Sequence, residues 1–90
     1  MRFEWDAAKA IANLRKHGVS FDEAATVFGD ALSATARDLD RSRGESRLLT
    51  FGMSSAGRLL VVSHTDRGST TRIISARPAT RHERKLYEEA

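Results

Sequence analysis

Two periods of apolar and polar residues run along the chain, a helical period in the first third and a two-residue alternation in much of the rest. Apolar residues recur at helical spacing from residue 7 to residue 16, after Asp6 at the N-cap position and before Gly18, a helix terminator. The pattern SFDE from Ser20 is a capping box, and it predicts a second, short helix that ends near Gly29. The first third of the chain is therefore predicted to be mainly helical.

Alternation of apolar and polar residues predicts strands after these helices and a short strand before them, over residues 3–5. Residues 38–45, rich in charge, Ser and Gly, are predicted to form a loop, and the capping box TRHE from Thr80 begins a C-terminal helix. The predicted fold is α+β, in a single domain over residues 1–90: a short N-terminal strand, two helices, an antiparallel four-stranded meander and a C-terminal helix. The meander strands are predicted at residues 31–37, 47–53, 59–65 and 69–77.

The composition excludes several classes of site. The 90 residues include no cysteine, which rules out disulfides, thiolate metal sites and cysteine nucleophiles. The three histidines lack the paired spacing of a helical metal site, and the sequence has no glycine-rich phosphate-binding motif. The longest aliphatic run, LLVV, is far shorter than the roughly 20 residues of a membrane-spanning helix. We therefore expect a cytoplasmic protein that uses no metal or other cofactor.

Positive charge is concentrated in the second half of the chain. Residues 1–45 carry seven Lys or Arg against eight Asp or Glu, whereas residues 46–90 carry eight against four. Twelve of the fifteen basic residues are arginine, whose planar guanidinium binds phosphate through two hydrogen bonds and stacks on bases. This preference favours a nucleic-acid phosphate partner. A GC-rich genome would give the same arginine content, so the positions of the arginines have to decide between the two explanations.

One histidine and two arginines are predicted to lie on neighbouring strands, His64 near the end of one and Arg72 and Arg77 on the next. If the connecting loop has three residues, Asp66 to Gly68, His64 shares a face of the sheet with Arg72. If the loop has two or four residues, His64 shares its face with Arg77 instead, because side chains alternate along a strand. Regular alternation does not put both arginines on that face. The plainer interpretation is that His64 is a surface residue and that Arg72 pairs with a carboxylate.

A histidine beside guanidinium groups suits the metal-independent cleavage of RNA. The 2′-OH of the RNA attacks the adjacent phosphate, so the protein has only to move protons and to stabilise the developing negative charge. A positioned general acid or base contributes roughly 10²–10⁴-fold, and an arginine aimed at the charge contributes about 3 kcal/mol. The alternative hypothesis is a non-catalytic module whose basic residues bind RNA or another protein.

Two stretches of the sequence resemble the BrnT family of bacterial toxins. The first, FEWDAAKAIANLRKHGVSFDEAATVFGD, contains the specific string KHGVSFDEA. The second, GRLLVVSHTDRGSTTRIISARPATRHERKLYEEA, contains the string RIISAR. The resemblance covers nearly the whole chain. It implies a fold similar to the RelE-like ribonuclease toxins, RNA cleavage that halts translation, and a BrnA-like antitoxin as partner.

The resemblance also implies site residues and a mode of assembly. By their match to RIISAR, Arg72 and Arg77 are implied as contacts to the phosphate and the transition state, with His64 as the proton carrier. Lys9 and Lys16, the latter beside the histidine of KHGVSFDEA, are implied as RNA-binding residues. Antitoxins of this type carry a ribbon-helix-helix DNA-binding segment. We therefore expect a hetero-oligomer of toxin and antitoxin that reaches operator DNA only through the antitoxin.

Overall fold

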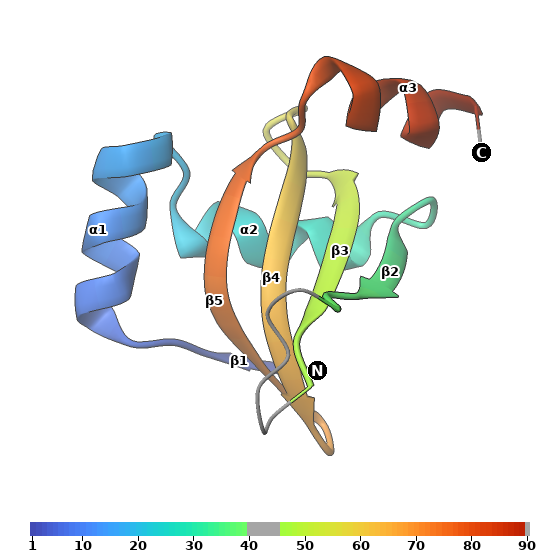
Figure 1. Ribbon diagram of the computed structural model, residues 1–90. Coiled ribbons are helices and arrows are strands. Elements are labelled where there is room, and N and C mark those ends of the chain that lie inside the picture. The colour runs from blue at the N-terminus through green and yellow to red at the C-terminus, as the bar shows by residue number, and fades with distance from the viewer. Residues whose placement is uncertain (40–45, 90) are drawn as a thin grey trace.

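The computed structural model describes residues 1–39 and 46–89, and in these residues three α-helices pack around a five-stranded sheet (Figure 1). Of the predicted loop 38–45, residues 40–45 lie outside the described part of the chain. No helix in the described residues is long and apolar enough to cross a membrane. The elements in chain order are β1 (Arg2–Glu4), α1 (Ala7–His17), α2 (Phe21–Thr26), the 3₁₀ turn η1 (Val27–Gly29), β2 (Ala34–Arg37), β3 (Leu48–Met53), β4 (Leu59–Arg67), β5 (Thr70–Pro78) and α3 (Arg81–Glu89).

The helix α1 begins and ends where the sequence predicts, whereas α2 begins as predicted but ends at Thr26, and the 3₁₀ turn η1 continues to Gly29. The Asp6 side chain accepts a hydrogen bond from the backbone N–H of Lys9, and Gly18 ends α1 in the left-handed conformation, with φ of 69°. Ser20 caps α2 by accepting from the N–H of Glu23. The Glu23 carboxylate does not complete this capping box, because it is bound to Arg58 and Ser54 instead.

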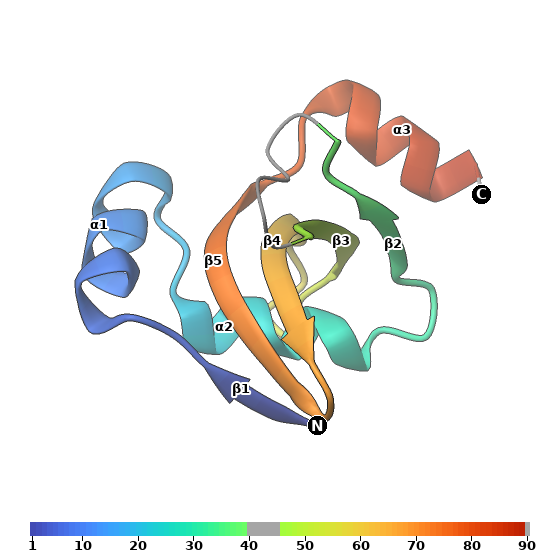
Figure 2. The same cartoon turned by 60° about the horizontal axis from the view of Figure 1, so that its bottom comes forward.

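The sheet has the strand order β1-β5-β4-β3-β2 (Figure 2). The pairs β2–β3, β3–β4 and β4–β5 are antiparallel, whereas β1 pairs in parallel with the first residues of β5. The sequence predicts a four-stranded sheet, but β1 joins it as a fifth strand and makes it mixed. The predicted sheet lacked this pairing because the partners are close to 70 residues apart, as in the pair Arg2 and Thr70.

The hairpin between β4 and β5 contains an irregularity that sets the direction of several side chains. Arg67 pairs with Thr70, so only two residues form the loop. Farther along, His64 pairs with Ile73 while Ser63 pairs with Ser75, which leaves one extra residue on β5. This β-bulge reverses the alternation of all later β5 residues relative to regular pairing.

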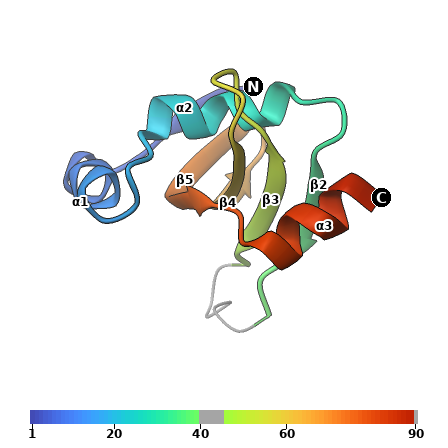
Figure 3. The ribbon, with the colours of Figure 1, turned by 90° about the horizontal axis from the view of Figure 1, so that it is seen from above.

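The sheet is covered differently on its two faces. Seen from above, α2 lies over one face, α3 lies near β2 and β3 on the other, and α1 stands beside β5 (Figure 3). The face under α2 carries the main hydrophobic core, in which Phe21 and Val27 are buried against the sheet. On the opposite face, Val61, Ser63 and Thr65 are also buried, whereas Ser75 on β5 is exposed. The buried core residues are Val19, Phe21, Ala24, Val27, Leu60, Val62, Ile73 and Ala76.

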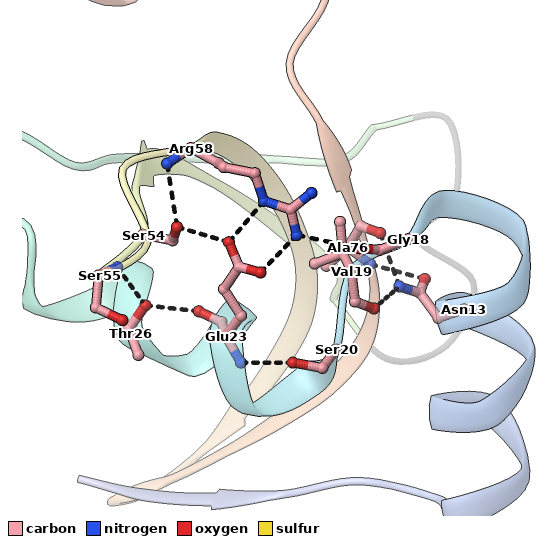
Figure 4. A network of polar contacts seen from close by, with 10 residues as sticks. All are labelled: Asn13, Gly18, Val19, Ser20, Glu23, Thr26, Ser54, Ser55, Arg58 and Ala76. Atoms are coloured by element: carbon pink, nitrogen blue, oxygen red, sulfur yellow. Dashed lines mark hydrogen bonds and ion pairs between the residues drawn. The ribbon is translucent and has the colours of Figure 1, made fainter.

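A buried asparagine fixes α1 to the sheet (Figure 4). Asn13 donates from its amide nitrogen to the carbonyls of Ala76 and Val19, at 2.8 and 2.9 Å, and its amide oxygen accepts from the Ala76 N–H at 3.0 Å. The side chain thus forms with Ala76 the two hydrogen bonds that a neighbouring strand would form. Because β1 pairs only with the first residues of β5, Asn13 satisfies the backbone farther along that edge.

A second polar network joins α2 to the turn between β3 and β4 (Figure 4). The Arg58 guanidinium donates to both oxygens of Glu23 and to the carbonyl of Gly18. Ser54 donates to the same carboxylate, and the Ser55 N–H donates to Thr26. The hydrogen bonds to the Glu23 carboxylate, of which those from Arg58 have the largest effect, hold the pKa of Glu23 below its ordinary value. The network holds the covering helix in place over the core.

Candidate nucleic-acid interface

Two adjoining pockets form a groove between α1 and the face of the sheet opposite α2. The larger pocket, about 350 Å³, is lined by Lys16, Arg47 and Arg77. The smaller one, about 220 Å³, shares its wall residues Lys16, His17 and Ser75 and continues the groove along α1 to Lys9. We call the residues Lys9, Lys16, His17, Arg47, Ser75 and Arg77 the basic groove. The other residues that line the two pockets are Ala12, Asn13, Asp38, Leu49, Ser63 and Ile74.

The lysines of the groove are placed by the docking of α1. Lys9, Asn13 and Lys16 are separated by four and three positions, which puts them on one side of a helix. Asn13 in the middle is tied to β5, so both lysines are held beside that strand while their side chains stay exposed. The side of α1 that faces the sheet therefore combines a structural amide with two cations. Both lysines line this groove, and their binding of RNA stays a prediction.

The bulge places Arg72 and Arg77 on the same face of the sheet. Arg72 pairs with Thr65 and Arg77 pairs with Val61, two β4 residues four positions apart and therefore on one face. His64 is an odd number of positions from both partners, so its side chain lies on the opposite face. Neither predicted arrangement is correct. The loop has two residues, which would give Arg77 the face of His64, but the bulge reverses it.

Of the two predicted arginines, Arg77 is the one that lines the groove. Its two terminal nitrogens donate to the two carboxylate oxygens of Glu83 at 2.7 and 2.9 Å, and Nη1 also donates to the carbonyl of Pro78 at 3.3 Å. This pairing lowers the pKa of Glu83 to about 2 and raises the pKa of Arg77. Both groups are therefore charged at neutral pH, and Arg77 is held in one orientation.

Arg72 lies outside the two pockets that form the groove. Its guanidinium donates to the carboxylate of Glu4 at 2.7 Å, and both side chains are more than two-fifths exposed. Glu4 and Arg72 are direct partners in the parallel pairing of β1 with β5. The carboxylate pairing of the plainer interpretation is thus present, and the implied contact of Arg72 with phosphate stays a prediction.

His64 is buried on the core face, with 1% of its surface exposed. Nδ1 is hydrogen-bonded to Asp66 at 2.9 Å and Nε2 to the Thr50 hydroxyl at 2.7 Å, and the ring packs edge-on against Phe28. The Thr50 hydroxyl continues to Thr35 on the edge strand, also at 2.7 Å. Both ring nitrogens have partners, and the sheet separates this ring from the groove. The structure does not bring His64 together with either arginine.

Several groove residues are absent from the predicted site. Arg47 directly precedes β3 and Ser63 lies on its neighbour β4, and no local motif marks them. His17 follows Lys16 in the string KHGVSFDEA, a signal that the dipole interaction at a helix C-terminus also explains. Glu83 is visible in the sequence only as the last residue of a capping box. Its contact with Arg77 requires that the helix after β5 turn back toward that strand, which the sequence pattern does not specify.

Comparisons with known proteins identify a structure of similar fold and the sequence family of the chain. The crystal structure of the Brucella abortus ribonuclease toxin, BrnT, at 1.1 Å resolution is similar to this structure, with a TM-score of 0.68 and 23% sequence identity. The similarity covers 90% of this chain and 99% of the Brucella chain. At this identity it establishes a shared fold. No curated protein sequence matches the chain.

The family assignment rests on the sequence match of most of the chain. The model of the family described as "Ribonuclease toxin, BrnT, of type II toxin-antitoxin system" matches residues 5–83. The matched region includes both lysines of the groove, Arg77 and Glu83, and it begins at Trp5, the residue after β1. The chain therefore belongs to the BrnT family of ribonuclease toxins of type II toxin-antitoxin systems.

Proposed function

We propose that this protein is a metal-independent endoribonuclease that binds RNA in the basic groove and uses the 2′-OH of the RNA as the nucleophile. The observation that carries the proposal is that Lys16 from α1 and Arg77 from β5 line one pocket of about 350 Å³. Membership of the family implies an RNA target and an antitoxin partner. The groove supplies what such a target needs, which is several cations on an accessible concave surface.

In the proposed reaction, a bond forms between the 2′-oxygen and phosphorus while the bond from phosphorus to the 5′-oxygen breaks. The products are a 2′,3′-cyclic phosphate and a free 5′-OH. A base takes the 2′-OH proton and an acid returns a proton to the 5′-oxygen, so the reaction has no net proton change. Arg77 and Lys16 stabilise the negative charge that grows on the phosphate oxygens. Lys9 and Arg72 contact phosphates on either side of the cut.

The imidazole in the groove is that of His17, and we propose that it carries a proton in this reaction. It lies next to Lys16 in both pockets. The role of proton carrier for His64 stays a prediction that its surroundings do not favour, because both nitrogens are hydrogen-bonded inside the protein. Replacement of His17 by Ala is expected to lower kcat by roughly 10²-fold or more, whereas loss of an imidazole that acts only at the helix terminus leaves kcat unchanged.

The central test compares two arginines of equal charge. Arg77→Ala is expected to lower kcat for cleavage of a single-stranded RNA by about 10²–10³-fold, because it removes a donor to the transition-state charge. Arg84→Ala removes the same charge from an exposed position on α3 and is the matched control. Circular dichroism establishes that both variants are folded. Equal activity of the two variants would show that Arg77 has no special role.

The nature of the RNA and the addition of a chelator test the mechanism. A single 2′-deoxy substitution at the cleaved position is expected to stop cutting there, and excess EDTA is expected to have no effect. A non-catalytic module would bind the RNA without cutting it. In that case Arg77→Ala would only reduce the salt dependence of binding, by about 0.7 in the slope of log K against log salt. RNA that stays intact with folded wild-type protein would exclude the endoribonuclease.

The partner and the cellular effect complete the proposal. The antitoxin is of the BrnA type, with a ribbon-helix-helix segment, and the hetero-oligomer reaches operator DNA through it. The fold is related to that of the RelE-like toxins, and cutting of cytoplasmic RNA arrests translation. Expression of this chain alone is expected to stop growth, and co-expression of the reading frame next to its gene is expected to restore it. Normal growth despite soluble, folded protein would contradict this.

A further inference from the structure

We propose that Glu83 is a positioning residue that orients the Arg77 guanidinium, so that one pair of N–H groups is presented to the substrate phosphate. This inference rests on the proposed function of the groove. Glu83 does not itself line the groove. It lines a separate apolar pocket under α3, with Leu86 and Tyr87, and it reaches the groove only through its contact with Arg77.

The carboxylate is itself held rigidly. Glu83 Oε1 accepts from the backbone N–H of Thr80, and the Glu83 N–H donates to the Thr80 hydroxyl, which completes the capping box of α3. Both oxygens also accept from Arg77, at 2.7 and 2.9 Å. The Glu83 side chain is only 18% exposed. The guanidinium is thus fixed by a carboxylate that a helix N-terminus holds in place.

The hydrogen bonds of Arg77 leave a suitable part of the guanidinium available. Of its five N–H groups, one on each terminal nitrogen binds Glu83, and the second on Nη1 points to the Pro78 carbonyl. Within the described part of the chain, the Nε–H group and the second N–H group of Nη2 donate to no protein acceptor. These two groups are adjacent and parallel, and they match two oxygens of a phosphate. The substrate therefore meets a fork whose plane is set before binding.

Because Glu83 is negatively charged, a positioning role can be distinguished from an effect on the electrostatic attraction between the groove and RNA. A carboxylate beside Arg77 weakens the attraction of the groove for RNA, so its removal would improve binding if charge alone mattered. A positioning role predicts the opposite for the chemical step, because an unrestrained guanidinium loses its alignment with the transition state. The pKa of Glu83, lowered to about 2 by Arg77, keeps the carboxylate ionised at neutral pH. The Glu83→Gln variant therefore removes a negative charge that the wild-type protein carries at neutral pH.

Single-turnover and steady-state cleavage of a short RNA by Glu83→Gln provides the test. The glutamine retains one acceptor, but its NH₂ group opposes the second N–H of the guanidinium, so a charge-assisted hydrogen bond is lost. We expect kcat to fall by about 10-fold to 100-fold while KM stays constant or decreases. In an Arg77→Ala background, the same change should have no further effect on kcat, since Glu83 acts through Arg77. Wild-type kcat in the single variant, or an equal loss in both backgrounds, overturns the proposal.

Thr80→Ala is the matched control for the helix cap. It removes the hydroxyl that accepts from the Glu83 N–H but retains the carboxylate and its contact with Arg77. We expect its kcat to stay within about threefold of wild type, although the protein is less stable. If Glu83→Gln does not fold, Glu83→Asp replaces it. This variant keeps the charge but shortens the side chain, and it should also reduce kcat.

A spectroscopic measurement separates failure of this inference from failure of the proposed function. In the wild type, the Arg77 Nη–H groups should give separate, resolved NMR signals that shift on titration with inorganic phosphate. In Glu83→Gln, rotation about the Nε–Cζ and Cζ–Nη bonds should broaden or average these signals. A signal that is unchanged by Glu83→Gln overturns the positioning role even if RNA is cut. If the NMR signals differ between wild type and Glu83→Gln but the wild-type protein leaves RNA intact, the endoribonuclease proposal is refuted, whereas the orientation of Arg77 by Glu83 is not.

Discussion

Asn13→Ala should be among the most destabilising single substitutions on α1. Asn13 is 6% exposed and makes three hydrogen bonds to the backbone, two of them to Ala76 on β5. Ala76 is buried, and both of its backbone groups turn toward α1. Alanine would leave its N–H without a partner in a place that water does not reach, and would remove one donor each from the carbonyls of Ala76 and Val19.

The magnitude follows from these three groups. A buried N–H that loses its acceptor costs about 1–3 kcal/mol, and each carbonyl that loses a donor costs about 0.5–1.5 kcal/mol. The higher helix propensity of alanine offsets about 0.5 kcal/mol. The expected net loss is about 3 kcal/mol, a large part of the roughly 5–13 kcal/mol that stabilises a domain of this size. The midpoint of thermal unfolding should fall by about 12–24 °C.

Urea unfolding followed by Trp5 fluorescence and circular dichroism measures this loss. Ala12→Asn is the matched control, because it places an asparagine at the exposed neighbouring position and should cost only about 0.5 kcal/mol in helix propensity. Asn13→Asp keeps the acceptor for the Ala76 N–H but turns an oxygen toward the two carbonyls, so it should destabilise at least as much as alanine. A loss below about 1 kcal/mol for Asn13→Ala would refute the view that its amide replaces a strand.

Two further predictions concern packing and pH. A Cβ at Gly52 would lie 2.8 Å from Val27 Cγ1, so Gly52→Ala should lower the free energy of unfolding, measured in urea, by about 1–3 kcal/mol. A Cβ at Gly29 would have no atom within 4 Å, so Gly29→Ala should be close to neutral. Equal effects of the two substitutions would contradict the packing argument. The pKa of Glu83 is lowered to about 2, so its ion pair with Arg77 contributes full stability above the ordinary value near 4.5 and loses it as the pH falls toward 2. The difference in Tm between wild type and Glu83→Gln should therefore shrink over this interval, and a constant difference would contradict the assignment.

The parts of the structure that could be predicted from the sequence are those that depend on neighbouring residues. Asp6, Gly18 and Ser20 end or begin helices through contacts within three or four positions, and their signals are local. The strand β3 also follows from its own alternation of apolar and polar residues, whereas the first seven residues of β4 are all buried. The order of helices and strands is correct for the same reason. Family membership followed from two specific strings, and the family model confirms it.

The parts that could not be predicted depend on contacts between distant residues or on an irregular pairing. β1 joins the sheet only because β5 leaves its edge uncovered near Thr70. Asn13 looks in the sequence like an ordinary polar residue of an amphipathic helix, yet its partner is 63 positions away. The bulge cannot be inferred from the alternation of apolar and polar residues, because it is the point at which one extra residue interrupts that alternation. Of the predicted site residues, Lys16 and Arg77 line one pocket and Lys9 lines the adjoining one, while His64 lies on the other face; their roles stay predictions.

Because of the bulge in β5, the number of residues between Arg72 and Arg77 determines which face of the sheet Arg77 occupies. Substitution of the residues between them can change packing, but it leaves the number of residues, and hence the face of Arg77, unchanged. Deletion of one residue in this interval would restore regular alternation and turn the Arg77 side chain toward the hydrophobic core. Evolution of this strand should thus tolerate changes of identity far better than changes of length. A protein library with single-residue deletions along β5 should lose activity here abruptly, while conservative substitutions at the same positions keep it.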